Sequence, residues 1–410
     1  MSADLDIRNA RLHGRDDLVD LVVRDGRIAT IAPGVTALGR PGVPVLDAAG
    51  GLVSRSFVEP HYHPDKAYSR ALAPDPDADP FARSTAIKAG FTADDVADRA
   101  ERALRLAVLN GVTAMRVTAD VDSVVGLRAV EGLLEACRRV DHLVDTDVVA
   151  FPQEGLLRDP GAEALLAQAV GLGARYVGGW PNVEDGLDAQ REHVRRVFDL
   201  AERQGVGVDL HVDCWISPDE VMLEVVAAET IARGLQGQVL VSHCCGLEVY
   251  DDVRAKRVVE LVAEADLRVV AIPLNLVDGG PRGLSRPVEL LAAGVTVALG
   301  SDNMSDGWYP LGTLDPLDRG QLGYLGIGFH EDADVDTVWE MITTSAAVAI
   351  GREPGEIAAG AAADLVVLSA PDRAHALARL PGTLTTVRGG QVVARRDLQV
   401  VVGETPEDAA

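Results

Sequence analysis

Five polar side chains stand directly after apolar, strand-like runs, and together they have the composition of a metal site. These side chains belong to His61, His63, His211, His243 and Asp302. His61 and His63 form a His-x-His pair, and because side chains alternate along a strand, both imidazoles can leave it on one side. Neutral imidazoles and a carboxylate suit Zn²⁺ or Fe²⁺ better than Ca²⁺ or Mg²⁺, which prefer oxygen ligands. A metal with few protein ligands also keeps a place for water and makes it a nucleophile near neutral pH, which favours hydrolysis.

The middle of the chain, residues 52–352, alternates strand-like with helix-like segments. Eight strand-like runs cover residues 52–60, 113–119, 147–152, 176–180, 206–212, 239–243, 268–273 and 296–301. Helix-like stretches between them include residues 94–110, 123–140, 185–204, 218–234 and 251–265. This alternation predicts an α/β fold of the (β/α)₈ barrel type, in which the active site lies at the carboxyl ends of the strands. The five polar residues and Gln153 fall at the ends of strands one, three, five, six and eight.

Both ends of the chain read as β-structure. Asp25-Gly26 predicts a tight hairpin near the N-terminus, and Gly389-Gly390 predicts another near the C-terminus. We therefore expect residues 1–51 and 353–402 to form one small β-sandwich domain beside the barrel of residues 52–352. Residues 403–410 are expected to form a disordered tail.

Composition excludes several classes of partner. The chain has 410 residues and a net charge of −25, whereas nucleic acids and anionic membrane surfaces require a basic protein surface. No apolar run reaches the length of a transmembrane helix, and the N-terminus lacks the pattern of a signal peptide. Four cysteines are too few for a disulfide framework. We expect a cytoplasmic protein without nucleic-acid or membrane partners, and the sequence leaves its oligomeric state open, a homo-oligomer included.

Longer motifs surround the candidate site residues. They are Phe57-Val58-Glu59-Pro60-His61-x-His63-x-Asp65-Lys66, Val149-Ala150-Phe151-Pro152-Gln153-Glu154-Gly155, Ser242-His243, Ser301-Asp302-Asn303 and Trp308-Tyr309-Pro310-Leu311-Gly312. With these motifs the chain resembles, over nearly its whole length, the amidohydrolase superfamily in the group of cytosine deaminase and N-isopropylammelide amidohydrolase. The combination of motifs is specific, whereas the His-x-His pair alone is weak.

The resemblance implies one divalent metal ion per chain, zinc or iron. Its implied ligands are His61, His63, His211 and Asp302. His243 would polarise the attacking water or the substrate, Gln153 would hydrogen-bond the heterocycle, and Trp308 would line the pocket. Asn303 can donate and accept hydrogen bonds at an amide-like ring edge. Lys66 either pairs with a nearby carboxylate such as Asp65 or reaches the substrate.

Some relatives hold two metals bridged by a carboxylated lysine from the fourth strand. Here that strand ends in Gly178-Gly179-Trp180, and none of the three lysines of the chain is near it in sequence. The residues therefore favour a single metal ion.

Three positions depart from the cytosine deaminase pattern. Cys214 stands where that enzyme has the glutamate that shuttles a proton, Thr118 replaces a histidine, and Ser301 replaces the histidine before the metal-binding aspartate. A neutral thiol is a poor proton donor, since its usual pKa is about 8.5. Protonation of the leaving amine is then left to Asp213, His243 or the substrate. Cys214 itself is better explained as a small residue of the pocket wall than as a reactive group.

The expected reaction is hydrolytic deamination of a small amino-substituted N-heterocycle, pyrimidine-like or triazine-like, with Asp302 as general base. Two alternatives stay open. The same site could release an alkylamine or open a cyclic amide, because barrels of this kind host many reactions. A protein that binds metal or ligand but has lost catalysis would also account for the three departures.

Overall fold

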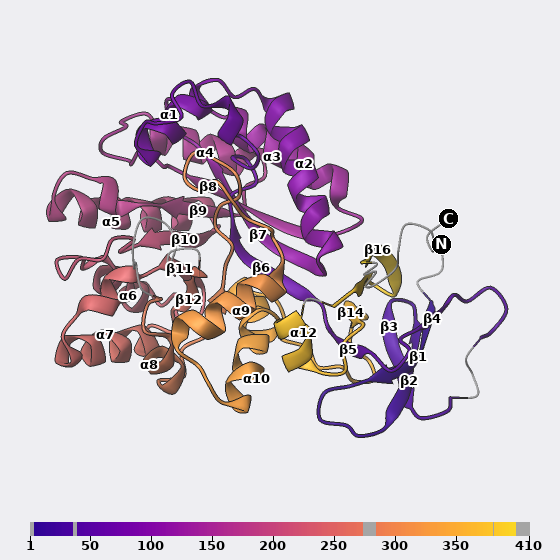
Figure 1. Cartoon of the computed structure of the whole chain (residues 1–410). Helices are drawn as coiled ribbons and strands as arrows, with labels where there is room; N and C mark the ends of the chain where they lie inside the picture. Colours follow the sequence, from indigo (N-terminus) through magenta and orange to yellow (C-terminus); the bar gives the residue numbers. More distant parts are fainter. Residues whose placement is uncertain (1–3, 36–38, 274–283, 380, 399–410) are drawn as a thin grey trace. The chain divides into compact units, whose positions relative to one another are not determined.

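The structure is a computed structural model that describes residues 4–35, 39–273, 284–379 and 381–398 (Figure 1). The chain divides into two compact units, which are described separately. One comprises Val58–Ala107 and Ala114–Pro354; the other comprises Met1–Phe57, Val108–Thr113 and Gly355–Ala410. The boundaries at residues 52 and 352 inferred from the sequence stay a prediction, and the expected tail, residues 403–410, lies outside the described residues.

The larger unit is built around a barrel of parallel strands. They are β6 (Phe57–Tyr62), β7 (Val112–Asp120), β8 (Asp145–Phe151), β9 (Tyr176–Gly179), β10 (Gly207–Val212), β11 (Val239–His243), β12 (Arg268–Ala271) and β13 (Val297–Leu299). Neighbouring strands pair in chain order, and a parallel bridge between Tyr62 and Asp302 joins the last strand to the first. The strands are rich in Val, Leu and Ala, whose compact side chains fill the interior. The predicted (β/α)₈ barrel is confirmed.

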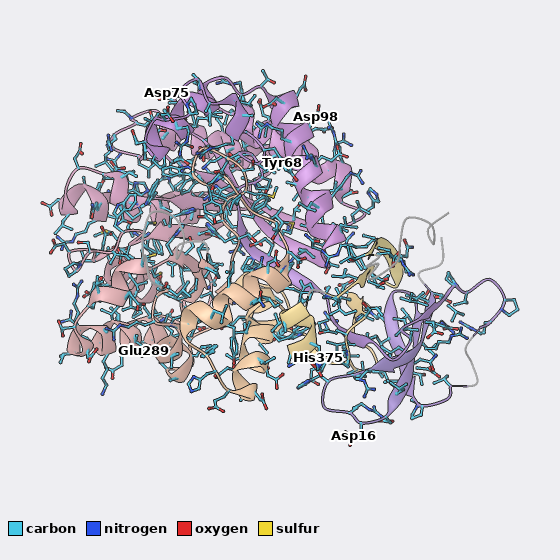
Figure 2. The ribbon with its side chains drawn as sticks, viewed as in Figure 1. Asp16, Tyr68, Asp75, Asp98, Glu289 and His375 are labelled. Atoms are coloured by element: carbon cyan, nitrogen blue, oxygen red, sulfur yellow. The ribbon has the colours of Figure 1, made fainter. Side chains whose placement is uncertain are left out.

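Helices follow the strands. They are α1 (Pro80–Ala89), α2 (Ala93–Leu109), α3 (Arg128–Val140), α4 (Ala162–Leu172), α5 (Leu187–Gln204), α6 (Met222–Arg233), α7 (Asp252–Glu264), α8 (Pro287–Ala292), α9 (Pro316–Ile327), α10 (Asp332–Met341) and α11 (Thr344–Ala349). Acidic side chains such as those of Asp75, Asp98 and Glu289 are exposed on this unit (Figure 2). None of the described helices is both long and apolar enough to cross a membrane.

Two predicted elements differ in detail. The first barrel strand, expected at residues 52–60, is interrupted at Ser56: β5 (Leu52–Arg55) pairs with β14 (Leu365–Leu368), and only β6 enters the barrel. The third helix starts at Arg128 rather than at residue 123. There the Asp122 carboxylate accepts hydrogen bonds from the next backbone N–H groups, which favours a turn over a helix.

The smaller unit is a β-sheet built from both ends of the chain. Its strands are β1 (Leu5–Arg11), β2 (Leu18–Arg24), β3 (Arg27–Ala32), β4 (Val45–Asp47), β5, β14, β15 (Thr383–Arg388) and β16 (Gln391–Asp397), and α12 (Arg373–Arg379) lies between β14 and β15. The β2–β3 turn holds Asp25-Gly26 and the β15–β16 turn holds Gly389-Gly390, so both hairpins are confirmed. Aliphatic residues from both termini share one core. This confirms a separate small β domain.

Candidate active site

Four of the predicted ligands converge at the carboxyl end of the barrel. Suitable atoms of His61, His63, His211 and Asp302 all lie within 4.8 Å of one another. The Nε2 atoms of His63 and His211 are 3.1 Å apart, and Asp302 Oδ1 is 3.4 Å from His61 Nε2. Ligand atoms about 2.1 Å from a tetrahedral ion are about 3.4 Å from one another, so the cluster has the dimensions of a divalent metal site.

The electrostatics of this cluster suit a metal ion. Burial, together with the charge of Lys66, holds the pKa of His63 well below its usual range, and burial next to His61 does the same for His211. Neutral imidazoles are the form that binds metals. Buried His61 Nε2 and His211 Nδ1 make no hydrogen bond to any described residue. Burial alone would raise the pKa of Asp302, but its contacts with His61 and His243 lower it, so the carboxylate is ionised at neutral pH.

Three residues at strand ends near the cluster have left-handed backbones. The φ angle is 49° at Asp213, 71° at His243 and 63° at Asp302. Side chains other than glycine rarely adopt this region, and such residues gather at functional sites because the surrounding structure must hold them there. At His243 the support includes the hydroxyl of Ser285, which donates to its carbonyl oxygen.

A buried ion pair fixes the strands that carry the ligands, and sequence reasoning missed it. Glu59 is almost fully buried in β6, and its carboxylate pairs with the Arg319 guanidinium from α9. The same carboxylate accepts hydrogen bonds from the backbone N–H groups of His61 at 3.0 Å and Ser301 at 3.1 Å. The available signal was a charged residue within an apolar strand, two positions before the first histidine of the His-x-His pair.

Most of the other predicted residues line one cavity that is open to solvent. Its wall contains His63, Lys66, Phe151, Gln153, Trp180, His211, Cys214, Trp215, His243, Asp302, Asn303, Trp308 and Tyr309. The structure thus brings all four expected substrate contacts and three of the four ligands to one wall. A cavity lined by aromatic side chains and a few convergent polar groups suits a small organic ligand.

Asp213 is placed differently from the other candidates. It is absent from the cavity wall, and its carboxylate accepts hydrogen bonds from the N–H groups of Met222 and Leu223, each at 2.9 Å, at the start of α6. Its carboxylate therefore stabilises a helix end. Cys214 does line the cavity and packs in an apolar cluster with Phe151 and Trp180. Burial raises the pKa of its thiol well above the usual range, so the thiol stays neutral.

Lys66 pairs with a carboxylate, although not with that of Asp65, and it also lies at the cavity wall. Its Nζ lines the cavity, donates to Gln153 and lies 2.8 Å from a carboxylate oxygen of Asp120 rather than of Asp65. A second buried lysine extends this network. The Nζ of Lys88 lies 3.3 Å from Asp120, 2.6 Å from Asp122 and 2.7 Å from Glu154. Lys88 carries no signal in the sequence, because an isolated lysine in a helix normally faces solvent.

Comparison with known proteins shows the family of the chain. The model of the amidohydrolase family matches residues 75–394. The chain belongs to this family. A pterin deaminase of Rhizobium rhizogenes is 32% identical, over 94% of this chain and 91% of that protein. The amidohydrolase also superimposes on the 5-methylcytosine deaminase of Klebsiella pneumoniae liganded with phosphonocytosine, with a TM-score of 0.88, 30% identity and coverage of 97% and 100% of the two chains.

A third similar protein is named for a different amine. It is the N-isopropylammelide isopropylaminohydrolase of Burkholderia multivorans, with a TM-score of 0.85, 30% identity and coverage of 97% and 100%. The superfamily resemblance inferred from the motifs is therefore confirmed. This amidohydrolase is an enzyme that hydrolyses carbon–nitrogen bonds.

In this amidohydrolase the end of the fourth barrel strand has no room for a side chain. A Cβ atom on Gly179 would lie 2.6 Å from His193 Nε2 and 2.8 Å from Leu210 Cδ2. His193 is fully buried and hydrogen-bonded to Glu184 at 2.8 Å, so it cannot easily move aside. A side chain at position 179 would therefore point towards α5, on the helix side of the strand.

Proposed function

We propose that this amidohydrolase removes an exocyclic amino group from a small N-heterocycle by hydrolysis. One divalent ion, zinc or iron, would be held by His61, His63, His211 and Asp302. The observation that carries the proposal is the placement of these four ligands at a cavity lined by hydrogen-bonding groups. The deaminases among the similar proteins support it.

Asp302 would act as the general base. When bound, the divalent ion supplies Lewis acidity that makes water a competent nucleophile near neutral pH. Asp302 is ionised, buried and part of the ligand cluster, so its carboxylate can accept the proton that the attacking water loses. His243 would donate a hydrogen bond to the oxygen on which negative charge develops, which is a large contribution in such reactions.

The remaining polar groups of the cavity would orient the ring. Gln153 and Asn303 present amides that match the alternating donors and acceptors of an amino-oxo heterocycle. Lys66 would donate to a ring carbonyl or ring nitrogen. If His63 binds the metal through Nε2, the proton of its imidazole is on Nδ1. Lys66 Nζ is 3.4 Å from this Nδ1 and cannot donate to it. The N–H groups of Lys66 are then available for Asp120, Gln153 and the substrate.

The leaving amine needs a proton, and the geometry limits which groups can supply it. Asp213 accepts helix N–H groups outside the cavity wall, and the thiol of Cys214 has a raised pKa. Asp302 can therefore return the proton that it took from water, directly or through His243. One water is consumed, the carbon–nitrogen bond breaks, and ammonia leaves with that proton.

A second candidate is release of an alkylamine by the same steps. It is favoured by the similar isopropylaminohydrolase, whose name describes such a leaving group. The two reactions share the nucleophile and the base, and they differ only in the substituent on the departing nitrogen.

Amine release by metal-loaded protein tests both candidates. The panel would contain amino-pyrimidines, amino-triazines and amino-pteridines, each with a free amine and as its N-alkyl derivative. Ammonia from free amines is expected, and alkylamine release alone would replace the first proposal by the second. No release from any compound, with one metal ion bound per chain, would refute both. Chelation with o-phenanthroline should stop turnover and addition of Zn²⁺ or Fe²⁺ should restore it, which also identifies the metal.

A further inference from the structure

Aromatic residues are concentrated at the cavity although the chain is poor in them. Only 4% of its residues are aromatic and only four are tryptophans, yet Trp180, Trp215 and Trp308 all line this cavity. The ring centroids of Trp180 and Trp308 are 5.8 Å apart, and those of Trp180 and Trp215 are also 5.8 Å apart. Phe81 completes the group at 5.7 Å from Trp308. We call these four residues the aromatic group.

The fold does not account for this group. Its members come from four separate places: Phe81 from α1, Trp180 after β9, Trp215 after β10 and Trp308 after β13. The barrel is otherwise packed with aliphatic side chains. Trp215 remains 38% exposed, so burying its ring contributes only part of what a core tryptophan would. Large flat side chains held partly open at a cavity are typical of a surface that receives a flat ligand.

Apart from the histidines, two residues of the cavity wall carry polar atoms without hydrogen-bond partners among the described residues. The Nε1 atom of Trp180 is buried, in a side chain only 6% exposed, and Oδ1 of Asn303 is buried as well. Native proteins normally avoid leaving a buried donor or acceptor without a partner. Trp180 thus brings an unused donor to the aromatic group and Asn303 an unused acceptor next to Asp302, both in residues of the cavity wall.

We infer that the substrate is a fused bicyclic amino-oxo heterocycle. The inference rests on the proposed function and specifies its substrate class. The ring that carries the amine faces the metal ligands and the amide of Asn303. The second ring packs against Trp215 and Trp308, and one of its ring nitrogens accepts a hydrogen bond from Trp180 Nε1. A single-ring substrate would leave the aromatic group without a contact. An alkyl substituent would contact the aromatic group but offer no hydrogen-bond acceptor to Trp180 Nε1.

The test compares product binding, because products bind to the intact holoenzyme without turnover. Pteridine-2,4-dione and uracil carry the same dioxo-pyrimidine ring and differ by the second ring. In isothermal titration calorimetry the bicycle should bind at least about tenfold more tightly, within the range measured for stacking one base on an aromatic side chain. Equal affinities for the two compounds would refute the inference.

Two variants locate the effect. Trp215→Ala removes an aromatic face, and Trp180→Phe keeps the face but removes the donor. Each should weaken binding of the bicycle by about fivefold or more and leave uracil nearly unchanged, since one stacked face or one hydrogen bond is worth about 1 kcal/mol. Trp339→Phe, in the buried part of α10, is the matched control and should change neither. Equal losses for both compounds would refute a role specific to the second ring.

The outcomes separate this inference from the proposed reaction. Deamination of single-ring compounds in preference to bicyclic ones would refute the inference and keep the reaction. Tight, Trp180-dependent binding of the bicycle without turnover of any amino-heterocycle would refute the reaction and keep the assignment of the aromatic group.

Discussion

The backbones of His61 and Asp302 are hydrogen-bonded to each other where the barrel closes. The N–H of Asp302 donates to the carbonyl oxygen of His61 across 2.9 Å, and the N–H of His63 donates to the carbonyl oxygen of Asp302 across 2.9 Å. Ligands from the first and last strands are thus held by the main chain before any metal binds. Closure of the barrel and geometry of the site therefore depend on the same contacts.

Arg319→Met should weaken both the fold and the metal site. Arg319 pairs with Glu59 and donates to the carbonyl oxygen of Val58 at 3.1 Å, so its loss leaves a buried carboxylate without its counter-charge. Removing one partner of a buried pair costs about 3–5 kcal/mol. Urea unfolding would measure this loss, and a metal titration should show lower affinity. Arg195→Met, which breaks an exposed pair with Asp199, is the control at no more than about 1 kcal/mol.

Asp302→Asn should remove catalysis while preserving the fold. The amide has nearly the shape of the carboxylate but cannot accept a proton from water, so kcat should fall by about 10²–10⁴-fold. Circular dichroism and the melting temperature of the chelated proteins would check the fold. Metal content per chain must be measured in parallel, because Asp302 is also a proposed ligand. Turnover within about tenfold of wild type, roughly 1.4 kcal/mol of barrier, would remove Asp302 from the role of base.

Lys88→Met and Lys256→Met form a matched pair that tests the buried carboxylates. Lys88 is buried among Asp120, Asp122 and Glu154, whereas Lys256 is exposed and its nearest carboxylate, on Glu260, is 4.0 Å away. Loss of Lys88 should cost about 3–5 kcal/mol, since Asp122 and Glu154 lose their counter-charge while Asp120 keeps Lys66. Loss of Lys256 should change the free energy of unfolding by about 0.5 kcal/mol or less. Similar effects of the two substitutions would contradict the network.

The position of Glu220 predicts a specific pH dependence of stability. Burial and the neighbouring charge of Asp213 raise the pKa of Glu220 to about 8, and its protonated side chain can donate to Asp213. The folded protein then binds a proton that the unfolded chain releases near pH 4.5. This contribution is fully present below pH 4.5 and is lost as the pH rises towards 8.

Glu220→Gln should remove that dependence, because the amide donates at every pH. The melting temperature of the wild type relative to this variant should fall between pH 5 and pH 9, as measured by calorimetry. The Glu248→Gln variant, on a largely exposed carboxylate nearby, should run parallel to wild type. Parallel curves for Glu220→Gln and wild type would show that Glu220 is already ionised in the folded protein.

Much of the barrel could be predicted because its signals are local. Apolar runs such as residues 239–243 end in a polar side chain, and the polar residue at such an end must lie at the carboxyl rim of a parallel barrel. His61, His211 and Asp302 were brought together by that rule alone. The hairpin at Asp25-Gly26 was equally local, because two residues with positive φ select the turn.

Other features depended on contacts between distant segments. Asp213 and His211 both lie at the end of β10. The Asp213 carboxylate nevertheless accepts hydrogen bonds from the first N–H groups of α6. No local pattern in the sequence specifies these partners. The sequence offers Asp65 as one nearby carboxylate for Lys66, whereas the structure pairs Lys66 with Asp120 from the next strand. The interruption of the first strand at Ser56 arises from pairing of β5 with β14, which comes from the other end of the chain.

The glycines at the end of β9 also limit how this enzyme could diverge. A lysine at position 179 would drive its Cβ into His193 and Leu210, on the side of the strand that faces α5. A lysine at position 178 would bring its Cβ within 3.1 Å of the Phe151 ring and of the Asp209 carbonyl oxygen. Acquiring a second metal would thus require several coordinated substitutions, and the intermediates would lose stability first. The lineage of this protein is consequently more free to change its substrate than its metal count.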